Sequence, residues 1–248
     1  MISAKSNHLQ RVRRLSIDRR TRREEGAFVV EGPHLVAEAI ALGIAEHVYV
    51  EPDVDVDGFE GIQVEAGALA KVTDAVSSQG VAAVVRLQAA ALDDVAAGAP
   101  VLVLAGLGDP GNAGTLLRTA EAAGFGAVLF TKGSVDPWSP KCVRASAGAV
   151  LRVPVIDGGE LATVLQQVAG SGRRRIGTRA HDADAYDRAE LPTDVALVLG
   201  NEAHGLPPGI DGELDGFVSI PMAGSVESLN VAMAGTILCF EVARRARA

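Results

Sequence analysis

Two continuous apolar segments, residues 101–105 and 195–199, constrain the fold of this chain more than any other feature. Runs without polar alternation are typical of strands buried on both faces of a parallel sheet. Around them, strand-like segments at 127–130, 151–156, 175–178 and 217–220 alternate with helical segments at 112–123, 140–147, 160–168 and 228–245. This alternation predicts an α/β domain whose parallel sheet is covered by helices.

A smaller α/β unit precedes this domain. Its predicted elements are helices at 6–23, 34–42 and 69–76 and strands at 27–31, 47–50 and 81–85. Residues 88–100 are rich in Ala, Asp and Gly and end at a proline, so we interpret them as a linker, with a short surface helix as the alternative. We therefore expect one domain at residues 1–95 and a second at 99–248.

The first predicted helix carries a basic face. Leu9, Val12 and Leu15 recur at three-residue steps with arginines between them, which is typical of an amphipathic helix. Residues 1–25 hold eight Lys and Arg against three Asp and Glu, although the whole chain has a net charge of −8. A local basic face can bind RNA phosphates, and a solvated helix face is the alternative. The candidate RNA-binding residues are Arg11, Arg13, Arg14, Arg19, Arg22 and, from a later segment beside Trp138, Arg144.

The cysteines and the apolar segments indicate the environment of the protein. Cys142 and Cys239 have neither metal-ligand spacing nor a pairing pattern, so we expect buried thiols in a reducing compartment and no metal site. The sequence contains no signal-peptide pattern and no apolar run of about 18 residues. These features predict a cytoplasmic protein without a membrane span.

A glycine pattern follows the first apolar segment. Gly106, Gly108 and Gly111 match the spacing of a dinucleotide-binding fingerprint, which would indicate a nucleotide-dependent oxidoreductase. That fingerprint expects an acidic residue at the end of the next strand to bind the ribose, but this strand ends in Phe130-Thr131-Lys132. A glycine turn between a strand and a helix is therefore favoured.

Three polar segments follow the predicted strands. In the first, Asn112 is placed to cap a helix, and Arg118 lies one turn beyond Gly114, where an arginine can bind a phosphate or a carboxylate. A surface arginine is the alternative. The second, residues 200–206, places Glu202 between two glycines at the carboxyl end of a strand, where open α/β sheets bind ligands.

The third polar segment connects the last strand to the last helix. The strand stops at Pro221, a Gly/Ser loop follows, and Ser228 is expected to cap a helix that runs to about Arg245. A loop with free backbone groups between a strand end and a helix start suits a polar small molecule.

Together these segments resemble the SpoU, or TrmH, family of RNA ribose 2′-O-methyltransferases in the SPOUT superfamily. Residues 112–120 read Asn-x-Gly-x-x-x-Arg-Thr-Ala, residues 200–206 read Gly-x-Glu-x-x-Gly-Leu, and residues 220–231 read Ile-Pro-Met-x-Gly followed by Ser-Leu-Asn-Val. The first part of the chain resembles the family's ribosomal-protein-like substrate-binding domain. Many members have a serine two positions after that asparagine, where this chain has Ala232, which affects fine contacts rather than the class.

The resemblance implies a trefoil knot in the C-terminal domain, a homodimer, S-adenosyl-methionine as cofactor without a metal, and an RNA substrate. Ribosomal RNA, 23S above all, is favoured; a tRNA enzyme and an inactive RNA-binding protein are the alternatives. The implied catalytic residues are Asn112, Arg118, Glu202, Ser228 and Asn230. The implied cofactor-binding residues are Thr178, Leu199, Gly200, Gly205, Leu206, Ile220, Met222, Ser228 and Leu229. Because a guanidinium stays charged, Arg118 is expected to position the ribose hydroxyl as a cation rather than act as a base.

Overall fold

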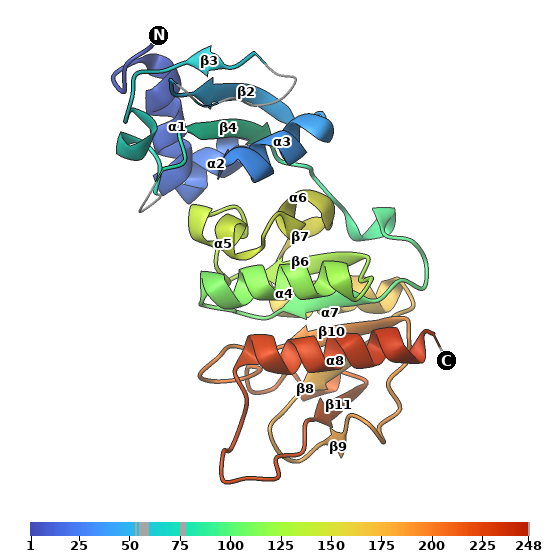
Figure 1. Ribbon diagram of the computed structural model, residues 1–248. Helices are drawn as coiled ribbons and strands as arrows, with labels where there is room; N and C mark the ends of the chain where they lie inside the picture. The colour runs from blue at the N-terminus through green and yellow to red at the C-terminus, as the bar shows by residue number, and fades with distance from the viewer. Residues whose placement is uncertain (53, 55–59, 75–77, 248) are drawn as a thin grey trace.

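The computed structural model describes residues 1–52, 54, 60–74 and 78–247. Figure 1 shows an N-terminal unit above a larger C-terminal unit, each built around its own sheet. The N-terminal sheet has the strand order β1-β4-β2-β3, in which β4 is antiparallel to β1 and β2, and β3 is parallel to β2. Its strands are β1 Ala27–Glu31, β2 Ala45–Val50, β3 Ile62–Gln63 and β4 Val81–Arg86.

The helices of the N-terminal unit differ from the predicted ones at their ends. They are α1 Asn7–Ile17, α2 Arg19–Glu25 and α3 Pro33–Ala41, with a 3-10 turn at Leu69–Lys71. The single helix predicted for 6–23 is wrong, because Asp18 is extended (φ −117°, ψ 114°) and its carboxylate caps α2 by accepting from the N–H groups of Arg20 and Thr21. The end of the helix predicted at 69–76 lies outside the described residues.

The C-terminal sheet confirms the parallel α/β fold. Its order is β7-β6-β5-β10-β8-β11-β9, and the strand pairs that the described residues form in it are parallel. The strands are β5 Val101–Leu104, β6 Ala127–Thr131, β7 Val155–Gly159, β8 Arg174–Thr178, β9 Asp184–Ala185, β10 Val195–Leu199 and β11 Gly216–Ser219. The two apolar segments, β5 and β10, lie side by side and are buried along their whole length. The trefoil knot stays a prediction.

Helices cover both faces of this sheet. They are α4 Pro110–Ala122, α5 Pro140–Ala145, α6 Ala149–Arg152, α7 Leu161–Gly170 and α8 Val231–Arg245. In Figure 1, α4 and α8 lie in front of the sheet, where Leu102 and Leu104 pack with Leu116 and Leu238. The alternate residues of β5, Val101 and Val103, belong to a second core with α7.

Glycines allow α4 to approach its neighbours closely. A Cβ on Gly235 of α8 would lie 2.4 Å from Leu116, and one on Gly114 of α4 would lie 2.4 Å from Ala145. The side-chain hydroxyls of Thr119 and Thr236 are 2.9 Å apart across the same α4–α8 contact. Gly114 and Thr119, two residues of the segment 112–120, therefore contribute to helix packing.

Two predicted boundaries are wrong. Ser228 does not cap α8, because Asn230 does, accepting from the N–H groups of Ala232 and Met233. The strand predicted at 151–156 begins only at Val155, since residues 149–152 continue as helix α6. Within the predicted linker, Leu92–Asp94 forms a 3-10 turn whose Leu92 is buried.

The two units share an apolar core. Phe28 of β1 packs in one cluster with Trp138, Val150 and Val153 of the C-terminal unit. Trp138 is 9% exposed, so it is a core residue. The domain limits at 95 and 99 stay a prediction.

No helix in the described part of the chain has the length and apolarity needed to cross a membrane. Among the same residues, no cluster of His, Cys, Asp or Glu is arranged to hold a metal ion. Both cysteines are free and buried, and burial raises the pKa of Cys142 to about 12.

Candidate active site

A cavity of about 630 Å³ opens at the carboxyl ends of β8, β10 and β11. The carboxyl ends of parallel strands meet at one edge of a sheet, and the loops that leave them form the site. Most of the predicted cofactor-binding residues line this cavity: Thr178, Gly200, Gly205, Leu206, Ile220, Met222, Ser228 and Leu229. Leu199 does not line it, because its side chain is buried in the core next to Gly235 of α8.

The loop after β10 is closed on itself. Asn201 and Gly205 exchange two backbone hydrogen bonds of 2.9 Å each, and Gly205 adopts a left-handed φ of +66°. A Cβ on Gly200 would lie 2.2 Å from the carbonyl carbon of Gly205. Both glycines are therefore required by the backbone, and the closed loop forms one wall of the cavity.

Glu202 joins this loop to the start of α4. Its carboxylate accepts from the backbone N–H groups of Gly108 and Asp109, each over 2.9 Å, and from Nδ2 of Asn112 over 3.1 Å. Burial alone would raise the pKa of Glu202, but the hydrogen bonds from Gly108 and Asp109 outweigh it and hold this pKa below its ordinary value. The N–H groups that a dinucleotide phosphate would need are thus occupied by a carboxylate, which argues against the oxidoreductase.

Asn112 and Asn230 extend the same network. The prediction that Asn112 caps α4 is wrong. Asp109 caps this helix by accepting from the N–H of Asn112. Instead Oδ1 of Asn112 accepts from Nδ2 of Asn230 over 3.0 Å. Residues from three predicted segments, Glu202, Asn112 and Asn230, are therefore connected by hydrogen bonds.

Arg118 is not brought to this cavity within one chain. It lies on the exposed face of α4 and is absent from the lining residues, whereas Ser228 lines the cavity. A direct role for Arg118 at the cavity requires either bound RNA or a second copy of the chain.

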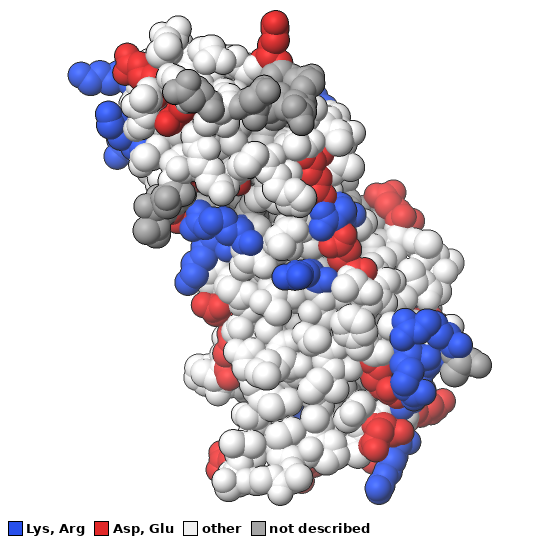
Figure 2. All heavy atoms as spheres, in the orientation of Figure 1, with Lys and Arg blue, Asp and Glu red and all other residues white. Residues whose placement is uncertain are grey.

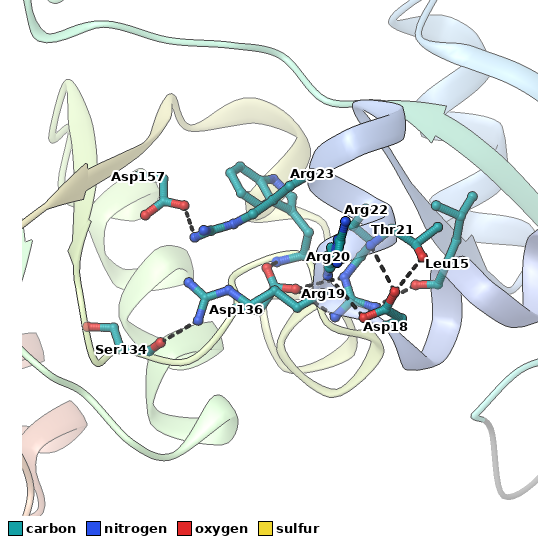
Figure 3. Close-up of polar contacts among 11 residues, drawn as sticks. Leu15, Asp18, Arg19, Arg20, Thr21, Arg22, Arg23, Ser134, Asp136 and Asp157 are labelled. Carbon is teal, nitrogen blue, oxygen red and sulfur yellow. Dashed lines mark hydrogen bonds and ion pairs between the residues drawn. The ribbon is translucent and has the colours of Figure 1, made fainter.

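The N-terminal arginines divide into exposed and structural ones. Arg13 and Arg14 are exposed, while Arg11 is half-buried between Glu25 (2.6 Å) and Glu46 (3.0 Å). The prediction that Arg22 binds RNA is wrong, because this residue is 3% exposed. It pairs with Asp136 of the C-terminal unit, as Figure 3 shows. Arg19, also drawn there, donates to the carbonyl of Ser134 over 3.1 Å, so it too contacts the C-terminal unit.

Basic side chains also gather where the two units meet. Figure 2 shows Lys and Arg around α5 and α6 at this junction. Arg144 of α5 is 41% exposed and pairs with Asp74 over 3.3 Å, so its charge is shared but accessible.

Arg179 is a cavity residue that the sequence did not single out. It directly follows Thr178, its guanidinium lies 3.5 Å from the centroid of the Phe217 ring, and it pairs with Asp211. Arg179 and Asp211 both line the cavity. The sequence feature that could have identified Arg179 is its position, because it is a cation directly after a strand that ends at the site.

A parallel α/β domain with a ligand cavity at its strand ends, preceded by a small α/β unit, is the class of protein that this geometry defines. The chain belongs to the SpoU rRNA Methylase family, which residues 99–240 match. Residues 7–83 match the MRM3-like substrate binding domain.

Relatives span nearly the whole chain. The 23S rRNA (guanosine(2553)-2′-O)-methyltransferase RlmP of Bacillus subtilis (strain 168) is 29% identical over 230 residues, which cover 90% of this chain and 91% of that protein. The crystal structure of an AdoMet-bound rRNA methyltransferase from Sinorhizobium meliloti is similar with a TM-score of 0.86 and 27% identity, covering 99% of this chain and 97% of that one. The crystal structure of the SpoU methyltransferase AviRb from Streptomyces viridochromogenes is similar with a TM-score of 0.84 and 26% sequence identity, and the match covers 97% of each chain.

Proposed function

We propose that this chain transfers the methyl group of S-adenosyl-methionine to a ribose 2′-hydroxyl of RNA, with 23S ribosomal RNA as the substrate. The observation that carries the proposal is the cavity at the ends of β8, β10 and β11, whose lining residue Glu202 is joined by hydrogen bonds to Asn112 and, through it, to Asn230. The relatives support it, since RlmP is named for 23S rRNA 2′-O-methylation and the Sinorhizobium meliloti enzyme was solved with AdoMet. This substrate would place the enzyme in the cytoplasm.

The residues of the cavity fit such a cofactor. A volume of about 630 Å³ lies within the range of roughly 300–1,000 Å³ for small-molecule sites. Gly200 has no room for a Cβ, so the backbone itself forms that wall and offers polar groups to an adenosine. Arg179 supplies a cation for a carboxylate. When bound, the sulfonium supplies an electrophilic methyl group.

The chain's own residues would align and polarise the ribose hydroxyl. The guanidinium of Arg118 is a cation that donates hydrogen bonds, so we assign it charge stabilisation and orientation. Glu202 fixes the loop at Gly108 and Asp109, and Asn112 and Asn230 hold this loop against the start of α8. Ser228, in the cavity wall, would contact the substrate or cofactor.

We further propose a homodimer formed through α8. Met233, Ile237 and Phe240 recur at three- and four-residue steps on one face of this helix and are 60%, 36% and 43% exposed. In Figure 2 the surface over α8 is almost free of charged side chains except near its C-terminal end. An exposed apolar stripe of this kind is typical of an interface. A second copy would supply the Arg118 that the cavity lacks within one chain.

Labelled methyl transfer to unmodified ribosomal RNA and tRNA tests the function. We expect label in ribosomal RNA, a loss of about 10²–10³-fold in rate in Arg118→Ala, and near wild-type rates in the control Arg174→Ala, a surface arginine paired with Glu190. Label in tRNA alone would assign the other substrate. Binding of S-adenosyl-homocysteine without label in either RNA would indicate an inactive RNA-binding protein.

A further inference from the structure

The contact between the two units contains a buried ion pair. Nε of Arg22 in α2 donates to Oδ2 of Asp136 over 2.7 Å, and its Nη2 lies 2.6 Å from the same oxygen. The two side chains are 4% and 7% exposed. Nη1 of Arg22 donates to the carbonyl of Leu15 over 2.5 Å, so the same guanidinium also fixes the end of α1 (Figure 3).

The partner of Arg22 lies on a loop that is bonded to the start of the active-site loop. Ser134 Oγ accepts from the N–H of Leu107 over 3.2 Å, and the N–H of Val135 donates to the carbonyl of Leu107 over 2.8 Å. The next two residues, Gly108 and Asp109, are those whose N–H groups bind Glu202. Short polar contacts therefore connect α2 to the Glu202–Asn112–Asn230 network.

Arg19 of α2 donates to the carbonyl of Ser134 on the same loop and so adds to the Arg22 contact, whereas contacts elsewhere between the units define their orientation less. The apolar packing of Phe28 against Trp138 and Val150 is strong but non-directional. The ion pairs of Arg23 with Asp157 and of Arg152 with Glu38 are partly exposed, and such pairs contribute little. In contrast, Nε and Nη2 of the buried Arg22 both lie within 2.7 Å of one oxygen of Asp136, and the planar guanidinium makes this contact directional. Replacing a buried ion pair by apolar residues of similar volume is often near neutral for stability.

We propose that Arg22 and Asp136 are positioning residues: they fix the orientation of the N-terminal unit, and with it the bound RNA, relative to the methyl-transfer site. The proposal rests on the proposed function, in which the N-terminal unit binds RNA. A displacement of about 1 Å at a reacting centre can lower a rate about 10²-fold, so a small rotation of the unit is sufficient to lower kcat. Neither side chain touches substrate or cofactor in this role.

The variant R22M/D136N removes both charges and leaves no buried charge unpaired. Its asparagine keeps an oxygen for the N–H of Trp138, which donates to Oδ1 of Asp136 over 3.1 Å. We expect a small decrease in melting temperature, because the carbonyl of Leu15 loses its hydrogen bond from Arg22. The Kd for S-adenosyl-homocysteine should stay near wild type, while kcat on ribosomal RNA falls at least tenfold. The matched control is R20M, which removes the exposed Arg20–Glu24 pair on the same helix and should leave kcat unchanged. A folded R22M/D136N variant with wild-type kcat would overturn the proposal.

A distance measurement tests the orientation without catalysis. Spin labels at Lys71→Cys in the N-terminal unit and Glu190→Cys in the C-terminal unit occupy exposed positions, and the buried Cys142 and Cys239 do not compete for label. Labelled chains are mixed with an excess of unlabelled ones, so that distances within one chain dominate even in a dimer. We expect a narrow distance distribution in the wild-type background and a broader or shifted one in R22M/D136N. An unchanged distribution overturns the proposal, even if no RNA is methylated and the proposed function itself fails. If R22M/D136N does not fold, R22K, which keeps the charge but not the fork, is measured in the same two ways and judged by the same outcomes.

Discussion

Nδ2 of Asn230 donates to Oδ1 of Asn112 over 3.0 Å and thereby joins two residues that lie 118 positions apart in the chain. The same Asn230 caps α8 with its own Oδ1. One side chain therefore fixes the start of the last helix and holds it against the first turn of α4. Because Asn112 also donates to Glu202, a change at Asn230 should extend to this lining residue of the cavity.

Asn230→Asp separates the two roles of this side chain. Aspartate keeps the oxygen that caps α8 but cannot donate to Asn112, so we expect a small change in melting temperature and a loss of at least tenfold in methyl transfer. Asn230→Ala loses both interactions and should also lose about 1 kcal/mol of stability from the cap. Thermal unfolding and single-turnover methylation of both variants check this, and equal activity in Asn230→Asp and wild type would contradict it.

Glu202→Gln should change how stability depends on pH. The folded-state pKa of Glu202 lies below its ordinary value of 4.5, despite the opposing effect of burial, because Gly108 and Asp109 donate to the carboxylate. Its stabilising contribution is therefore fully present above the unfolded-state pKa and is lost as the pH falls through the folded-state pKa. We expect the difference in melting temperature between wild type and Glu202→Gln to be largest near neutral pH and to shrink below about pH 4. A difference that does not vary with pH would refute this.

Arg179→Ala should discriminate between ligands with and without a carboxylate. The guanidinium lies in the cavity wall, where it contacts Phe217 and pairs with Asp211, and we propose that it binds the amino-acid end of the cofactor. Loss of a charged hydrogen bond of about 1.5–3 kcal/mol corresponds to at least tenfold weaker binding of S-adenosyl-homocysteine. Methylthioadenosine, which lacks this end, should bind as to wild type. Calorimetry measures the Kd of both ligands for the variant and for wild type. An equal loss of affinity for both ligands would contradict the assignment of Arg179 to the amino-acid end.

Ile237→Glu should dissociate the proposed dimer. A charge in the centre of the apolar stripe on α8 is costly to bury, so the variant is expected to be monomeric by light scattering and to lose methyl transfer while staying folded. Leu42→Glu, which alters an exposed apolar residue of the N-terminal unit, is the control. A wild-type protein that is already monomeric at micromolar concentration would rule out the interface.

The central strands of the C-terminal sheet could be predicted because strands that are buried on both faces consist of apolar residues. Residues of β5 and β10 are apolar at every position and are buried at every position. The start of α8 could not be predicted, since Ser228 and Asn230 are both good capping residues. Only the contact with Asn112, distant in sequence, distinguishes them.

The candidate site was predictable to the extent that it depends on strand ends. The loops that carry the predicted cofactor-binding residues follow β8, β10 and β11, and each of these loops contributes residues to the cavity lining. Arg22 was misassigned because it lies among arginines on a basic segment, while its carboxylate partner is 114 positions away. A charge pattern identifies cations but not whether a distant anion neutralises them.

The apolar cluster that contains Phe28, Trp138 and Val153 also limits how the N-terminal unit can be exchanged between proteins. A substrate-binding unit taken from a relative would have to bring a complementary apolar face, or leave Trp138 in water. The two halves are consequently not freely exchangeable, because the inner surface of the N-terminal unit has to match the apolar surface around Trp138.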